Sequence, residues 1–325
     1  MLVLFLNKFD KYWDGKLDQL RKAFPGHDFV SYLDHKDPKE LLPEADVLVK
    51  GSLSKEELTK AVKLKAVFVP WTGVDGLPLN ELKKRSIILA NNHGNAEVVA
   101  ERAIALAMAV TGRVVELHKN LEKGVWLGRP SSKEFTWFSI LERKCAILGL
   151  GQIGQKIAGF LKAFRCRING FKKEPSGSYP GIDFITNDIK QAVRGAELVF
   201  VALPLTSETF GIVNQEVLDA MGSAYLINIS RGKVVEEKAL AESLMSGKLA
   251  GAAIDVWYDY PSIDRPVTLP SRYPIHTLPN VVLSPHVGSW TTESMQAMVD
   301  ETVESIGHYL LTGNPIDIVD LEKMY

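Results

Sequence analysis

Short runs of consecutive hydrophobic residues alternate with longer, mostly polar segments along the first ninety residues. Such runs, bounded by polar residues, are typical of buried strands, whereas apolar residues three or four apart are typical of helices. The predicted strands of this part are Val3–Leu6, Val47–Val49, Ala66–Val69 and Ile87–Ala90. Because helical segments separate them, we expect one α/β domain.

A second series of such runs follows a turn-forming cluster at 91–95 and an alanine-rich helix predicted over Ala96–Leu121. Its predicted strands are Lys144–Leu148, Arg167–Phe171, Leu198–Ala202, Tyr225–Asn228, Gly251–Ile254 and Val281–Leu283. A helix near 291–311 would return the chain to the first domain. We therefore expect an α/β protein with two doubly wound parallel-sheet domains, one of residues 1–94 and 289–325 and the other of 95–288.

Composition limits the possible partners. At 325 residues and 46% hydrophobic content, the chain can bury two cores, and its net charge of −1 favours neither nucleic acid nor a membrane surface. The longest apolar run, Ile104–Val110, is too short to span a bilayer, and Met1–Asn7 lacks the basic segment of a signal sequence. Cys145 and Cys166 lack the spacing of a metal site. We expect a cytoplasmic protein without a metal.

Three glycines, Gly149, Gly151 and Gly154, stand where a predicted strand turns into a predicted helix. In this pattern the first glycine permits a tight turn, the second lets phosphates approach the backbone, and the third lets the helix pack on the strand. The helix begins near Gln152 and Ile153, and a helix N-terminus attracts negative charge. The pattern predicts a site for the pyrophosphate of a nicotinamide dinucleotide.

Two lysines, Lys172 and Lys173, follow the next predicted strand. In NAD-binding domains an acidic residue at this place accepts hydrogen bonds from the adenosine ribose, and its charge repels a 2′-phosphate. Two ammonium groups attract that phosphate instead. We expect NADP to be preferred and NAD to remain possible, because arginine is the more usual fork for a phosphate.

Arg231 and His286 each follow a predicted strand, at the edge where open α/β sheets bind ligands. Arginine can hold both oxygens of a carboxylate, and histidine exchanges a proton near neutral pH. Hydride reduction of a 2-oxo acid needs such a cation and a proton donor for the carbonyl oxygen. His93, in the turn beside the domain boundary, is an alternative proton donor.

The chain also resembles the D-isomer-specific 2-hydroxyacid dehydrogenases over nearly its whole length. This family includes glyoxylate/hydroxypyruvate reductases and D-3-phosphoglycerate, phosphonate and formate dehydrogenases. The resemblance is carried by the glycine turn and by residues 95–101, 203–209, 228–232, 253–257 and 284–288. It implies a flavodoxin-like substrate-binding domain and an inserted Rossmann dinucleotide-binding domain.

The resemblance implies roles for five residues of the second domain. Arg231 would bind and polarise the substrate, and His286 would donate a proton during reduction or accept one during oxidation. Asp255 would hold the carboxamide of the nicotinamide ring, while Pro204 and Ile229 would contribute to the cofactor site.

In the first domain, the resemblance points to the loop that begins at Trp71. The backbone amides of Thr72 and Gly73 would hold the substrate carboxylate, with Asn95 also at the substrate. Trp71 stands where many members of the family have glycine, so it would narrow the pocket. Lys50 would either add a second positive charge or lie in solvent.

One departure from the family concerns the partner of the histidine. Members usually carry a glutamate just before a proline in the segment after Asp255, whereas this chain has Tyr260 there. Its phenol would orient His286 by a neutral hydrogen bond, without stabilising an imidazolium as a carboxylate does. Asp259 is the alternative partner.

These observations favour an NADP-preferring reductase of small 2-oxo acids, such as glyoxylate or hydroxypyruvate, that works as a homodimer. The aromatic-rich segment Gly124–Ser139 is expected to form a dimer arm. Two alternatives stay open. One is the oxidation of formate or phosphite, suggested by the missing glutamate and by Lys50, and the other is a non-catalytic protein that senses the dinucleotide.

Overall fold

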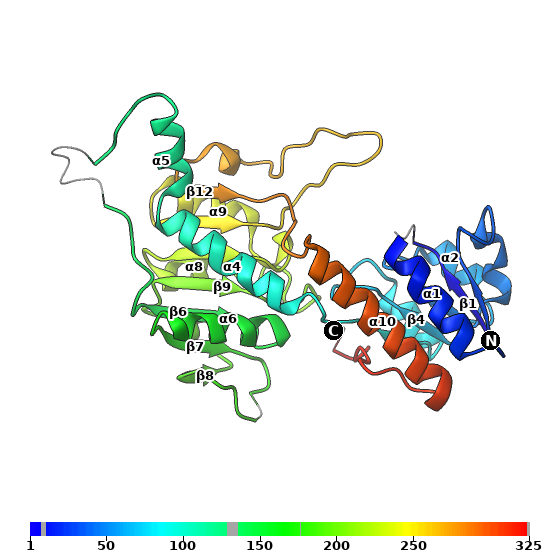
Figure 1. The fold of residues 1–325 in the computed structure, drawn as a ribbon. Coiled ribbons are helices and arrows are strands. Elements are labelled where there is room, and N and C mark those ends of the chain that lie inside the picture. The colour runs from blue at the N-terminus through cyan, green and yellow to red at the C-terminus, as the bar shows by residue number, and fades with distance from the viewer. Residues whose placement is uncertain (8–10, 129–135, 176, 324–325) are drawn as a thin grey trace. The chain divides into compact units, whose positions relative to one another are not determined.

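The structure is a computed structural model that describes residues 1–7, 11–128, 136–175 and 177–323. Contacts within the chain divide it into two compact units, one of Met1–Asn95 with Ser289–Tyr325 and one of Ala96–Gly288. Each unit is a parallel α/β domain (Figure 1), which confirms the predicted fold class. Among the described residues, no helix is both long and apolar enough to cross a membrane.

The described residues of the first unit form a five-stranded sheet in the order β2-β1-β3-β4-β5, which is the flavodoxin-like order. The strands are β1 (Leu2–Phe5), β2 (Asp28–Val30), β3 (Val47–Val49), β4 (Ala66–Phe68) and β5 (Ile88–Ala90). The helices are α1 (Lys11–Ala23), the 3₁₀-helix η1 (Pro38–Glu44), α2 (Lys55–Lys60), α3 (Leu79–Lys84) and α10 (Thr292–Thr312).

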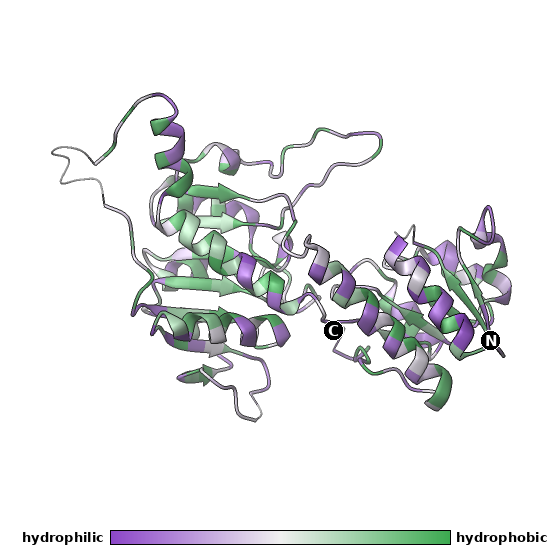
Figure 2. Cartoon of the chain, in the orientation of Figure 1, coloured by the Kyte–Doolittle hydropathy of each residue, from purple (hydrophilic) through white to green (hydrophobic). Residues whose placement is uncertain are grey.

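Helices cover both faces of this sheet because successive strand residues point to opposite sides. Phe5 and Phe68 pack with residues of α1 and α10 on one side, and Leu48 and Leu89 pack with residues of η1, α2 and α3 on the other. In Figure 2 the strands are mainly green, and the helices carry purple on part of their circumference. The C-terminal helix α10 therefore completes the core of the N-terminal domain.

The described residues of the second unit form a seven-stranded sheet in the order β12-β11-β10-β9-β6-β7-β8. The strands are β6 (Lys144–Leu148), β7 (Arg167–Phe171), β8 (Phe184–Thr186), β9 (Leu198–Val201), β10 (Tyr225–Asn228), β11 (Gly251–Ile254) and β12 (Val281–Leu283). The helices are α4 (Ala96–Thr111), α5 (Val114–Leu121), α6 (Gln152–Ala163), α7 (Ile189–Val193), α8 (Gln215–Met221), η2 (Gly232–Val234), α9 (Glu237–Met245) and η3 (Pro274–Thr277).

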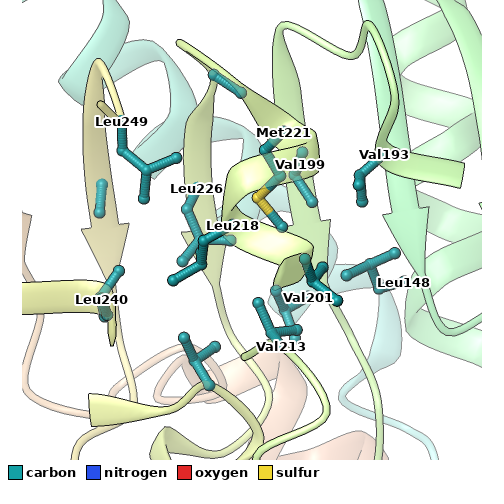
Figure 3. Packing of buried hydrophobic residues seen from close by; sticks show 14 of the residues in the cluster. Leu148, Val193, Val199, Val201, Val213, Leu218, Met221, Leu226, Leu240 and Leu249 are labelled. Atoms are coloured by element: carbon teal, nitrogen blue, oxygen red, sulfur yellow. The ribbon is translucent and has the colours of Figure 1, made fainter. Parts of the chain in front are cut away.

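Two apolar clusters enclose this sheet. On one face Leu148, Val201 and Leu226 pack with side chains of α7, α8 and α9, among them Met221 (Figure 3). On the other face Phe200 and its neighbours pack against α4 and α6. The reversal of strand order lies between β6 and β9, which is where such sheets bind dinucleotides.

The structure differs from the sequence-based expectations in three places. The helix predicted over Ala96–Leu121 is two helices, because Arg113 takes a left-handed conformation (φ 51°) next to Gly112, a residue that disfavours helix interiors. Strands β2 and β8 were not expected. They contain three residues each and lie at sheet edges, and so they lack a long apolar run. Of the predicted dimer arm Gly124–Ser139, residues 129–135 lie outside the described part.

Candidate active site

The glycine turn joins β6 to α6 at the carboxyl edge of the seven-stranded sheet. Gly149 has a φ of 104°, and a Cβ atom there would lie 2.6 Å from the carbonyl oxygen of Ala202, just after β9. Gly154 packs so tightly that a Cβ atom would overlap the carbonyl oxygen of Gly149. Side chains at these two positions would break the turn.

The second glycine of the pattern, Gly151, faces open space and begins α6 without a side-chain cap. The first N–H groups of a helix lack partners within it, so those of Gln152 and Ile153 are available to an anion. The cradle formed by this turn and the uncapped helix fits a dinucleotide pyrophosphate.

The two lysines after β7 have different surroundings. The Lys173 Nζ atom lies 2.6 and 2.7 Å from the two carboxylate oxygens of Glu208, and both side chains are exposed. The Lys172 Nζ atom lies 4.9 Å from the ring centre of Tyr179. One of the two expected phosphate ligands therefore already faces a carboxylate, which the sequence did not reveal.

Pro204 and Ile229 lie at the same edge of the sheet, after β9 and β10. The carbonyl oxygen of Pro204 accepts a hydrogen bond from Thr209 Oγ1 at 2.6 Å. The buried Ile229 donates its N–H to the carbonyl oxygen of Val201 at 3.4 Å. Because β9 is the neighbour of β6, the segment that leads to Pro204 passes the glycine turn, and Ile229 follows the next strand along the sheet.

Arg231 follows β10 in a turn that is fixed from inside. The buried Asn228 accepts hydrogen bonds from the N–H and hydroxyl of Ser230, at 3.1 and 3.0 Å, and donates to the carbonyl oxygen of Arg231 at 3.3 Å. Gly232 then packs so tightly that a Cβ atom would overlap the carbonyl oxygen of Trp257. The guanidinium donates to the carbonyl oxygen of Ser230 at 2.8 Å.

Asp255 follows β11 and is 2% exposed. Its carboxylate accepts hydrogen bonds from the Ser284 hydroxyl, from the N–H of Val287 at 3.1 Å and from the N–H of Gly288 at 3.0 Å. An ionised carboxylate has about four acceptor positions. Room for roughly one further donor therefore remains, which suits the carboxamide predicted there.

His286 lies in the loop that Asp255 holds, with a φ of 58°. Its ring contacts the ring of Tyr260, with centres 5.6 Å apart and planes at 52°. The Tyr260 hydroxyl accepts a hydrogen bond from the N–H of Trp257 at 2.9 Å. Asp259 lies 4.0 Å from the guanidinium of Arg265. Tyr260 therefore lies directly beside the histidine ring, and its role as the partner of His286 stays a prediction.

The segment that carries Tyr260 is anchored at both ends. The hydroxyl of the half-buried Tyr258 donates to the carbonyl oxygen of Val235 at 3.0 Å, and desolvation raises the pKa of Tyr258 above its usual range. At the other end Glu237 accepts from the Ser271 hydroxyl at 2.9 Å and from the Arg272 guanidinium at 2.8 and 3.1 Å.

In the first unit, Lys50 is buried and its ammonium pairs with Glu57. Glu57 also accepts from the N–H of Ser54, at the start of α2, and lies 3.3 Å from Lys39. Burial opposes ionisation of Glu57, but the hydrogen bonds from Lys50 and Ser54 outweigh it and lower its pKa to about 2. A carboxylate thus offsets the positive charge that the sequence suggested for Lys50.

The indole of Trp71 lies across Gly51, where a Cβ atom would overlap the ring. This contact leaves Trp71 39% exposed, after the carboxyl end of β4. Only glycine at position 51 gives the indole this room. The position of Trp71 is therefore set by a glycine of the neighbouring loop, after β3.

Thr72 and Gly73 continue this loop. The Thr72 hydroxyl donates to the buried Asn95 side chain at 2.7 Å, and Asn91 donates to the carbonyl oxygen of Thr72 at 2.7 Å. Within the described part of the chain, the N–H groups of Thr72 and Gly73 have no hydrogen-bond acceptor. Two adjacent unpaired amides of this kind suit a carboxylate.

Two further expectations concern an alternative proton donor and a metal site. The N–H of His93, the alternative proton donor, bonds to Glu301 at 3.0 Å within the first unit. The described residues contain no cluster of three or more histidine, cysteine or acidic side chains that could hold a metal ion.

One residue near the histidine loop escaped the sequence analysis. Arg102, on α4, donates from Nη2 to the Ser284 hydroxyl at 3.0 Å. The two residues are 182 positions apart, so neither motif spacing nor periodicity links them. The only signal was the place of Arg102 one residue after the segment 95–101.

Comparison with known proteins gives the family. The model of "D-isomer specific 2-hydroxyacid dehydrogenase, NAD binding domain" matches residues 104–288. A glyoxylate reductase of Thermofilum pendens is 32% identical over 284 residues, which cover 85% of this chain and 81% of that protein. A hydroxyphenylpyruvate reductase of Plectranthus scutellarioides is 34% identical over 322 residues, 97% of each chain.

The fold also matches a solved structure. It is the NADPH-dependent glyoxylate/hydroxypyruvate reductase of Sinorhizobium meliloti in complex with NADP and malonate, with a TM-score of 0.77 and 25% identity. The match covers 98% of this chain and 97% of that one. From the family model and these relatives, the chain belongs to the D-isomer specific 2-hydroxyacid dehydrogenase family.

Proposed function

We propose that the protein is an NAD(P)H-dependent reductase that converts small 2-oxo acids into D-2-hydroxy acids. The observation that carries this proposal is the carboxyl edge of the seven-stranded sheet, where the glycine turn, Arg231 and His286 all follow strand ends. Similarity to a glyoxylate reductase and a hydroxyphenylpyruvate reductase supports reduction over the oxidation of formate or phosphite.

In this proposal the glycine turn and the start of α6 would hold a nicotinamide dinucleotide, which would supply the hydride for the carbonyl carbon. The Arg231 guanidinium neutralises the substrate carboxylate and the negative charge that develops on the carbonyl oxygen. An N–H of the His286 imidazolium donates its proton to that oxygen, which completes the hydroxyl group. Asp255 fixes the histidine loop and offers its remaining acceptor position to the carboxamide.

For the first unit we propose that the N–H groups of Thr72 and Gly73 bind the substrate carboxylate, with Asn95 fixing the loop. Trp71 limits the size of the substrate side chain. Lys50 contributes less than its charge suggests, because Glu57 lies against it.

NADP preference is part of the proposal, in a moderate form. Lys172 and Lys173 attract a 2′-phosphate, but the Glu208 carboxylate repels it and competes for Lys173. We therefore assign the larger share of phosphate binding to Lys172.

We also propose that the enzyme is a homodimer. Helix α5 has no buried residue, and its Val114 and Leu121 are 55% and 50% exposed. Trp126 and Trp137 add apolar surface, at 68% and 61% exposure. Large exposed apolar side chains are typical of protein interfaces, and light scattering after gel filtration tests this proposal. The cytoplasmic location expected from the sequence stays a prediction.

The test of function follows NADPH oxidation with glyoxylate, hydroxypyruvate and 4-hydroxyphenylpyruvate, alongside NADP reduction by formate and phosphite. We expect turnover with at least one 2-oxo acid and none with formate or phosphite. Tight NADPH binding without any turnover would instead identify a dinucleotide-sensing protein.

Two variants test the assigned roles. Arg231→Lys keeps the charge but loses the fork, and His286→Asn removes the proton donor. We expect each to lower kcat by about 100-fold or more, with NADPH binding retained. Near-normal turnover in Arg231→Lys would show that the substrate binds elsewhere, and near-normal turnover in His286→Asn would show that another group donates the proton.

A further inference from the structure

The backbone of His286 is held in a conformation that its own sequence does not favour. Its φ of 58° lies in the left-handed region, which a side chain with a Cβ atom rarely adopts. Such a conformation persists only where the surroundings determine it. Neighbouring residues must therefore hold His286 in this conformation.

Contacts with Asp255 bracket the histidine. The hydroxyl of Ser284, two residues before His286, donates to one carboxylate oxygen. The N–H groups of Val287 and Gly288, directly after it, donate to the same carboxylate at 3.1 and 3.0 Å. A Cβ atom at position 288 would lie 2.9 Å from Asp255 Oδ2, so this close approach of the loop to the carboxylate needs glycine.

Arg102 determines how the Ser284 hydroxyl is used. Its Nη2 atom donates to Ser284 Oγ at 3.0 Å, so a lone pair of the hydroxyl faces the guanidinium. The single hydroxyl hydrogen is then directed to Asp255. The three groups form a chain from cation through hydroxyl to carboxylate.

The guanidinium of Arg102 makes fewer hydrogen bonds than its donors allow. Its Nε atom is buried and, among the described residues, has no hydrogen-bond acceptor. A buried donor without a partner is unfavourable and needs an explanation. The contact with Ser284 supplies one, because it places a positive charge behind the carboxylate that holds the histidine loop.

We propose that Arg102 is a positioning residue for His286. Through Ser284 and Asp255 it holds the histidine backbone in the left-handed conformation that directs the imidazole for proton transfer, without itself touching substrate or cofactor. The inference rests on the proposed reduction of 2-oxo acids.

A double-mutant cycle tests whether Arg102 acts through Ser284. The variants are Arg102→Met, Ser284→Ala and the double variant. The control is Glu97→Gln: Glu97 lies on α4, as Arg102 does, and its exposed carboxylate pairs with Lys156 of α6 at 3.3 Å. We expect each single variant to lower kcat by about tenfold, since small misplacements of a reacting group reduce turnover strongly. The double variant should lose about tenfold as well, rather than about 100-fold, because both changes break one chain of contacts.

The KM for the 2-oxo acid and the dissociation constant of NADPH should change less than kcat. Losses that multiply in the double variant, or single variants with unchanged kcat, would overturn the proposal. If Ser284→Ala does not fold, Arg102→Lys decides, because lysine restores a charged donor and should regain part of the lost kcat. Equal losses in Arg102→Lys and Arg102→Met would contradict the role of that donor.

A second measurement does not depend on turnover. Hydrogen exchange of the peptide containing residues 284–288 reports on the N–H groups that Asp255 binds. Exchange should accelerate in Arg102→Met and Ser284→Ala but not in Glu97→Gln. Unchanged exchange would overturn the inference even if the wild-type protein reduced no 2-oxo acid, whereas faster exchange in an inactive wild type would contradict only the proposed function.

Discussion

Glu208 is the residue that most directly bears on the choice of cofactor, because it faces one of the two lysines expected at the 2′-phosphate. Glu208→Gln should raise the affinity for NADPH relative to NADH by about two- to fivefold, the range of an exposed ion pair. Fluorescence titration with both cofactors measures the ratio.

The control for this variant removes an equivalent charge elsewhere. Glu216→Gln breaks the exposed pair with Lys190 at 3.1 Å, and the ratio should not change. Lys172→Asp should reverse the preference. Equal affinities for the two cofactors in the wild type and in Glu208→Gln would refute the assignment of these lysines.

Tyr260 leads to a prediction about pH. Reduction needs the imidazolium of His286, so activity should fall as pH rises and the imidazolium loses its proton. Tyr260→Glu would place a negative charge beside the ring and favour the imidazolium, so the descending limb should move to higher pH. Tyr260→Phe should change the limb little.

Asp259 provides the opposing case. If it were the partner of the histidine, Asp259→Asn would move the descending limb to lower pH. A shift in Asp259→Asn together with an unchanged profile in Tyr260→Glu would reverse the assignment. Initial rates across pH, at saturating NADPH, separate the two outcomes.

Residue identity could be read from the sequence where a chemical group follows a strand end, as Arg231 and His286 do. Partners could not. Glu57, Glu208 and Arg102 approach their partners through helix orientation and loop path, which no local pattern specifies.

At the scale of elements, the central strands were predictable because each is a run of buried residues bounded by polar ones. Both strand β6 and strand β7 begin and end where we expected. The edge strands β2 and β8 are short and partly exposed, so burial left no pattern in them. The break between α4 and α5 depends on one left-handed residue, for which the sequence offered only Gly112.

Helix α2 provides an element whose stability depends on pH. The pKa of Glu57 is about 2 in the folded protein, below its ordinary value of 4.5. Because its pKa is lowered in the folded protein, the ionised Glu57 stabilises the fold at pH above about 4.5. This stabilisation is lost as the pH falls from about 4.5 to about 2. Glu57→Gln should lower the free energy of unfolding at pH 7 by about 1–2 kcal/mol, because Lys50 stays buried without its carboxylate.

Urea unfolding at pH 7 and at pH 3 measures this effect. The difference between wild type and Glu57→Gln should shrink at the lower pH. Glu44→Gln, which breaks the exposed pair with Lys63, is the control and should change little at either pH. A pH-independent difference for Glu57→Gln would show that packing, rather than charge, causes the loss.

At the scale of the whole molecule, the two units differ in how they are encoded. The second unit is one continuous segment, Ala96–Gly288, whereas the first needs both ends of the chain. Expressed alone, residues 96–288 should unfold cooperatively on heating and bind NADPH. Residues 1–95 alone should lack fixed tertiary structure by near-ultraviolet circular dichroism and regain it when the peptide 289–325 is added. A cooperative transition in 1–95 alone would contradict this dependence.

Because α10 completes the first core, the order of synthesis differs from the order of folding. Phe5 and Phe68 leave the ribosome early, but Ile306 and Tyr309, which pack against them, are translated near the end. At roughly 5–20 residues per second, the intervening unit takes about 10–40 seconds to make. During that interval Phe5 and Phe68 lack the helix that covers them, so we expect the inserted unit to mature first and the opening segment to bind chaperones.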